Sequence, residues 1–215
     1  MARAFAGELT AGGDVVVHAA GVSNSQCVDP REFERESEAL QRSLHDAPDS
    51  GLLVYFSTCS VLDPASAASP YVEHKMRMEE RARSHPGHLI LRLPQVAGRT
   101  PNPHTLLNYL YARISRGERF TVWQEARRNV IDVEDVRKLG FALIRSGVSG
   151  ATFNIAAPES HAMPEIVSTM ERVTGGHAVY DLVKRGAATT SAQRAKRRLV
   201  TDRLPARSRA TTVSR

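Results

Sequence analysis

Three side chains that could move a proton lie within eighteen residues of one another: Thr58, Tyr71 and Lys75. Tyr71 and Lys75 are four residues apart, so a helix would place both on one face, one turn from each other. The reference pKa of tyrosine is about 10, and an ammonium about 5 Å from the phenolate stabilises it by on the order of 3 kcal/mol at an effective dielectric of about 20. We therefore predict that Tyr71 gives or takes a proton, that Lys75 favours the phenolate, and that the Thr58 hydroxyl binds the substrate oxygen.

Most isolated Y-x-x-x-K pairs in helices are structural and not catalytic, so the surroundings of this pair decide how it is interpreted. Apolar runs predict strands, and capped amphipathic stretches predict helices. The strands are expected at 14–21, 52–57, 88–93 and 152–156, and the helices at 30–45, 70–84, 105–115 and 164–173. This alternation favours an α/β fold with a parallel sheet covered on both faces, and such sheets bind ligands at the carboxyl ends of their strands.

Composition and charge exclude several classes of protein. An apolar fraction of 41% and a charged fraction of 24% are typical of a soluble globular chain. Residues 184–215 hold ten basic residues and one acid, a charge of +9, which leaves 19 basic and 22 acidic residues, a charge of −3, for 1–183. The sequence has no apolar run of about 20 residues, no signal peptide, no C-x-x-C and no convincing metal-ligand set. We therefore expect a cytoplasmic protein without membrane or metal partners.

Six segments in sequence order resemble the landmarks of one known family. They are DVVVHAAG, VYFSTCSV, SPYVEHK, LILRLPQVAGRTPNP, RRNVIDVEDV and TFNIAAPES. The family is that of the extended or atypical short-chain dehydrogenases/reductases, the NAD-dependent epimerases and dehydratases of sugar nucleotides, and the resemblance covers about residues 14–175. It implies a Rossmann-like, doubly wound parallel sheet with a small C-terminal substrate lobe, and NAD or NADP as a hydride shuttle.

On this resemblance, Thr58, Tyr71 and Lys75 are the catalytic residues. Ser60 is an alternative to Thr58, but it lies eleven residues before the tyrosine, which is shorter than the usual spacing in the family. The cofactor-binding positions that the resemblance implies are Ala19, Ala20, Gly21, Lys75 and Pro94. The three small residues are also consistent with tight packing of a buried strand.

Arg128 resembles the family's arginine that meets the nucleotide diphosphate of the substrate. The alternative for Arg128 is a surface arginine paired with Glu125 or Asp132. His74, between the tyrosine and the lysine, is expected to lie on another helical face in solvent. Ser37 stands where the family usually carries an asparagine.

The sequence departs from the family at its beginning. The G-x-x-G-x-x-G turn that holds the pyrophosphate does not occur in the 215 residues. We expect an N-terminally truncated sheet, a loss of cofactor affinity, and an exposed strand edge at 14–21 that a homodimer or a partner chain would cover. The expected domain spans 1–175, with substrate-lobe elements mainly at 94–135 and 157–175, followed by a basic, disordered tail at 176–215.

Three functions are consistent with these features. The first is an NAD(P)-dependent sugar-nucleotide epimerase, dehydratase or reductase of the kind used in polysaccharide biosynthesis, or a remnant of one. The second is a non-catalytic sugar-nucleotide-binding or regulatory protein. The third is a nucleic-acid binder acting through the basic tail, which is disfavoured because no aromatic residue is interleaved with the arginines. Whether the chain is an enzyme stays open at this point.

Overall fold

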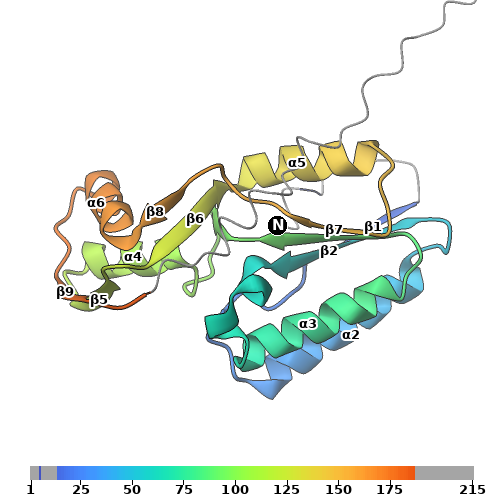
Figure 1. Cartoon of the computed structure of the whole chain (residues 1–215), viewed down its shortest axis with the longest axis horizontal. Coiled ribbons are helices and arrows are strands. Elements are labelled where there is room, and N and C mark those ends of the chain that lie inside the picture. Colours follow the sequence, from blue (N-terminus) through green and yellow to red (C-terminus); the bar gives the residue numbers. More distant parts are fainter. Residues whose placement is uncertain (1–4, 6–13, 187–215) are drawn as a thin grey trace, which may run out of the picture.

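The computed structural model describes Phe5 and residues 14–186. Its central feature is a four-stranded parallel sheet in the order β1-β2-β3-β7 (Figure 1). The strands are β1 (Val15–His18), β2 (Leu52–Thr58), β3 (His88–Leu93) and β7 (Ala151–Asn154). β2 and β3 lie in the middle of the sheet and are buried along most of their length, as expected for strands covered on both faces.

Helices cover both faces of the sheet, with α2 (Pro30–Asp46) and α3 (Pro70–Arg83) on one side and α5 (Val133–Arg145) on the other (Figure 1). The first two helices begin where the sequence signals a start. The Asp29 side chain accepts a hydrogen bond from the Arg31 backbone N–H, the Ser69 side chain accepts one from Val72, and a proline follows each cap. The α/β, Rossmann-like parallel sheet predicted from the sequence is therefore confirmed.

Successive residues of β2 point into two different cores. Val54 and Phe56 pack on the α5 side, where Phe5 fills the space between Phe56 and Phe141, with ring centroids 5.2 and 4.9 Å away. Leu53 and Tyr55 pack on the opposite side, against α2 and α3. β2 is thus held from both faces, which keeps its carboxyl end in place.

A smaller lobe, formed by segments before and after β7, has its own apolar core. It contains α4 (Leu106–Ser115) and α6 (Met163–Thr174), together with β5 (Phe120–Trp123), which pairs in parallel with β9 (Tyr180–Val183). A three-stranded sheet of β4 (Gln95–Ala97), β6 (Arg127–Asp132) and β8 (Ser160–Ala162) leads from the main sheet toward this lobe (Figure 1).

The segment 176–215 and the edge strand β1 can be compared with the sequence-based expectations. β9 lies within 176–215, the segment expected to be a tail, and residues 187–215 lie outside the described residues. β1 is at the edge of the described sheet, as expected, and covering of this edge by a second copy or a partner chain stays a prediction. Within the described residues, no helix has both the length and the apolar character needed to cross a membrane.

Candidate active site

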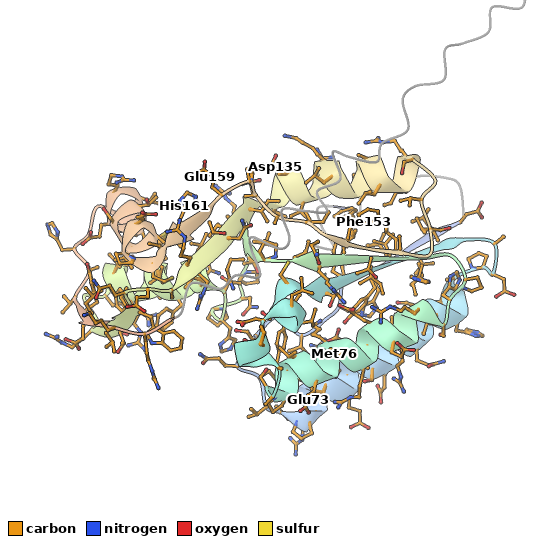
Figure 2. All side chains as sticks on the ribbon, viewed as in Figure 1. Glu73, Met76, Asp135, Phe153, Glu159 and His161 are labelled. Atoms are coloured by element: carbon orange, nitrogen blue, oxygen red, sulfur yellow. The ribbon has the colours of Figure 1, made fainter. Side chains whose placement is uncertain are left out.

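The three predicted catalytic residues meet where β2 ends. Thr58 is the last residue of β2, and its Oγ1 accepts a hydrogen bond from the backbone N–H of Ser60 at 3.1 Å, which starts the short 3₁₀ helix η1 (Cys59–Leu62). Tyr71 and Lys75 lie on the buried face of α3, whereas Glu73 and Met76, labelled in Figure 2, are exposed on that helix. The four-residue spacing therefore directs both predicted side chains toward the sheet.

Tyr71 is buried, and the Thr58 side chain lies close enough to affect its pKa. Burial raises the pKa of Tyr71 to about 12, because it outweighs the lowering by the Thr58 side chain and is reinforced by the negative charge of Glu36. This direction is opposite to the sequence-based expectation that Lys75 favours the phenolate. At neutral pH the Tyr71 side chain is therefore a phenol that can donate a proton.

Lys75 does not offset this effect of burial, because its ammonium is bound elsewhere. Lys75 is only 2% exposed, and its Nζ donates to Glu36 Oε1 at 2.8 Å and to Tyr55 Oη at 3.3 Å. The same Nζ is 6.0 Å from the centroid of the Tyr71 ring. Burial lowers the pKa of Lys75, and the Glu36 carboxylate counteracts that shift. The charge of the ammonium is thus directed mainly at the carboxylate.

Glu36, on α2, is a residue of the site that the sequence reasoning missed. It is completely buried, and its carboxylate accepts hydrogen bonds from four groups: the Val22 N–H, Tyr55 Oη, His74 Nε2 and Lys75 Nζ. Burial by itself would raise the pKa of Glu36, but these hydrogen bonds and the Lys75 charge lower it overall. A signal was available, because Glu36 occupies the apolar face of an amphipathic helix, three residues after Phe33 and four before Leu40.

The expectation for His74 was wrong. His74 is 1% exposed, its Nε2 lies 3.0 Å from Glu36 Oε2, and its ring stacks on Phe33 with centroids 4.5 Å apart. The side chain is buried because α2 packs beside α3 and covers this face of the helix. Ser37, the neighbour of Glu36, instead donates from Oγ to Met78 Sδ at 3.6 Å.

The predicted cofactor positions surround the same strand ends. Gly21, after β1, lies against the buried ion pair, because a Cβ added there would be 2.7 Å from Lys75 Nζ and 2.8 Å from Glu36 Oε1. Ala19 is half-buried and Ala20 exposed. Pro94 follows Leu93, which is the register partner of Thr58 in the sheet, so it begins the loop beside the end of β2.

Arg128 is half-buried on β6, and its Nη1 donates to the Arg127 carbonyl oxygen at 3.0 Å. Burial lowers the pKa of Arg128, and the charge of Asp63 raises it. Because Asp63 ends the short helix that starts after Thr58, Arg128 lies within electrostatic reach of the loop next to the predicted triad. The acid that acts on Arg128 is therefore Asp63, and not the Glu125 or Asp132 considered from sequence.

These residues fit one end of a nicotinamide dinucleotide better than the other. The nicotinamide end is suited by the small residues that follow β1 and by the tyrosine and lysine of α3, all of which lie near the carboxyl ends of parallel strands. The pyrophosphate end has no counterpart in the described part of the chain, whose first described helix, α2, follows Asp29 and Pro30 and no glycine-rich turn. The fit is thus limited to the nicotinamide end.

Comparisons with known proteins identify the family and the fold. A family profile described as the NAD dependent epimerase/dehydratase family matches residues 3–156. No curated protein sequence matches the chain. Among solved structures, it is similar to UDP-glucuronic acid 4-epimerase from Bacillus cereus in complex with UDP-glucuronic acid and NAD, with 20% identity, a TM-score of 0.67, and coverage of 84% of this chain and 68% of that chain.

Two further solved structures have a similar fold at low sequence identity. dTDP-glucose 4,6-dehydratase from Bacillus anthracis, in complex with NAD, has 16% identity and a TM-score of 0.63, with 86% of this chain and 66% of that chain covered. UDP-glucose 4-epimerase from Thermus thermophilus, also with NAD, has 16% identity and a TM-score of 0.64, with 86% and 72% covered. At these identities the likeness shows the fold, and the chain spans about two thirds of the length of these proteins.

Proposed function

Because this chain belongs to the NAD-dependent epimerase/dehydratase family, we propose that it acts on sugar nucleotides as an epimerase, dehydratase or reductase, with Tyr71 as the acid/base group. The observation that carries the proposal is the meeting of Thr58, the last residue of β2, with the buried Tyr71 and with Lys75, which lies one turn along α3. The similar structures that contain NAD and UDP-glucuronic acid support the classes of cofactor and substrate.

In this proposal a sugar hydroxyl or carbonyl oxygen binds between the Thr58 hydroxyl and the Tyr71 phenol. Thr58 orients the oxygen, and Tyr71 exchanges a proton with it. NAD or NADP, when bound, supplies the hydride acceptor or donor for this chemistry. Ala19, Ala20, Gly21, Lys75 and Pro94 are the residues that would hold its nicotinamide end.

The nucleotide part of the substrate is assigned to Arg128. A guanidinium donates two parallel hydrogen bonds to a phosphate, which suits the diphosphate of a sugar nucleotide. The proximity of Arg128 to Asp63 supports a position next to the loop that follows Thr58. The substrate would then extend from the strand ends toward the smaller lobe.

The test is turnover of UDP- and dTDP-linked sugars with NAD(H) or NADP(H), followed by chromatography of the nucleotide products. We expect Tyr71→Phe to lower kcat by about 10²- to 10⁴-fold, the usual contribution of general acid/base catalysis, with little change in KM. Tyr109→Phe is the matched control, because Tyr109 is 40% exposed on α4. Full turnover by Tyr71→Phe would remove Tyr71 from the mechanism.

A second function is favoured by one observation: Glu36 binds the Lys75 ammonium. It is the binding of sugar nucleotides without redox chemistry. Fluorescence titration with NADH and NADPH, beside calorimetry with UDP-sugars, separates the two functions. Sugar-nucleotide binding without cofactor binding supports the second, whereas micromolar cofactor affinity supports the enzyme and contradicts the expected loss of cofactor affinity.

A further inference from the structure

We propose that Glu36 is a positioning residue of the site, which keeps Lys75 charged, holds its ammonium beneath the loop after β1, and leaves Tyr71 to act as a neutral phenol. The inference rests on the proposed function only in taking Tyr71 as the group that meets the substrate oxygen. The arrangement around Lys75 does not depend on which sugar nucleotide binds.

The hydrogen bonds of Glu36 connect four segments of the chain. Oε1 accepts from Lys75 Nζ at 2.8 Å and from Tyr55 Oη at 2.7 Å. Oε2 accepts from the Val22 backbone N–H at 2.7 Å and from His74 Nε2 at 3.0 Å. Each carboxylate oxygen thus has two donors, which is the full capacity of an ionised carboxylate. Glu36 therefore remains ionised although it is completely buried.

Gly21 provides the space for this ion pair. The loop after β1 crosses directly over Lys75 Nζ and Glu36 Oε1, so closely that any side chain at position 21 would displace one of them. The Val22 N–H, one residue further, donates to Glu36 and ties the loop to the pair. The small residues after β1 therefore serve the ion pair as well as any cofactor that lies against this loop.

The titratable and charged groups around Lys75 come from several elements of the fold. These groups are Glu36 and Arg35 on α2, Tyr55 on β2, His18 on β1, and His74 and Glu79 on α3. Glu36 is the only acid among them with a hydrogen bond to Nζ, as far as the described residues show. The Glu36 carboxylate and the Lys75 ammonium act on Tyr71 together, as a dipole and not as a lone positive charge. Such a dipole stabilises the phenolate less than a lone ammonium would, which is consistent with a Tyr71 pKa raised to about 12 by burial.

The first experiment measures the charge of Lys75 by NMR of ¹³Cε- and ¹⁵Nζ-labelled lysine in the whole chain, without cofactor or substrate. The sequence has four lysines, at positions 75, 138, 184 and 196, so the spectrum is simple, and Lys75→Met assigns the signal. In Glu36→Gln the burial of Lys75 is no longer offset. We expect its titration midpoint to fall by at least about one pH unit, while the signal of the exposed Lys138 does not move.

Glu34→Gln is the matched control, because Glu34 is an exposed acid on the same helix and its removal should leave the Lys75 midpoint unchanged. A Lys75 midpoint that is the same in Glu36→Gln and in the unmodified chain overturns the proposal. If Glu36→Gln does not fold, Glu36→Asp takes its place: its shorter carboxylate should weaken the pair and lower the midpoint part of the way, and an unchanged midpoint again counts against the proposal.

A second measurement needs no Glu36 variant. With ¹³Cζ-labelled tyrosine, and Tyr71→Phe to assign the signal, Tyr71 of the unmodified chain should remain a phenol up to at least about pH 9, whereas a midpoint below this value overturns the proposal. Neither experiment requires turnover. A failure of the proposed function would show as an active Tyr71→Phe enzyme, and a failure of the present inference as altered titrations, so the two are distinguishable.

Discussion

Replacing Glu36 with alanine tests how much the buried ion pair contributes to stability. The substitution leaves the Lys75 ammonium, which is 2% exposed, without its carboxylate, and it removes the acceptor of the Val22 N–H and of Tyr55 Oη. Removing one partner of a buried ion pair costs about 3–5 kcal/mol. For a domain of this size each kcal/mol lowers Tm by about 2–4 °C, so we expect a decrease of roughly 6–20 °C.

The assay is urea unfolding at pH 7, followed by circular dichroism, on Glu36→Ala, Lys75→Met and the double variant. The double variant should recover much of the loss, because methionine keeps the apolar stem of lysine without a buried charge, and the coupling energy should reach about 2 kcal/mol. Glu38→Ala is the control, since Glu38 is an exposed acid on the same helix, 3.9 Å from Arg42, and should cost less than about 1 kcal/mol. A loss below about 1 kcal/mol in Glu36→Ala, or additive effects in the double variant, would refute the reasoning.

Three further outcomes are expected. Burial lowers the pKa of His18 to about 4, and its buried Nε2 has no hydrogen-bond partner in the described part of the chain. As the pH falls from about 6.5 to 4, the unfolded chain therefore takes up a proton at His18, whereas the folded chain does not. Urea unfolding should show that the free energy of unfolding decreases by up to about 3 kcal/mol over this window, and that the decrease is smaller in His18→Gln. An equal loss in that variant would mean that another group is responsible. Thr58→Val should lower kcat by about 10²-fold or more and Ser60→Ala by far less, and the reverse order would assign the substrate hydrogen bond to Ser60. Arg128→Ala should weaken UDP-sugar binding in calorimetry by about 10- to 100-fold, the loss of a charged hydrogen bond, whereas equal effects of Arg128→Ala and Arg127→Ala would contradict a specific role.

The sequence by itself determined the features that depend on neighbouring residues. The starts of α2 and α3 follow from Asp29 and Ser69, whose side chains bind backbone groups two or three residues away and precede a proline. The placement of Tyr71 and Lys75 on one face follows from helical periodicity, and the burial of β2 follows from its apolar run. β5, β6 and β9 were not foreseen, because strands of four to six residues that are partly or wholly exposed carry little local signal.

Only the tertiary structure decided the electrostatics of the site. The Glu36–Lys75 ion pair joins residues 39 positions apart, and it exists because α2 packs beside α3 over the same strand. That packing also buries His74 and directs the Lys75 charge to a carboxylate. The pKa of a phenol depends on its burial and on all the charges around it, whereas sequence spacing reveals only those on its own helix. The positions of Tyr71 and Lys75 could therefore be predicted from the sequence, but the direction of the Tyr71 pKa shift could not.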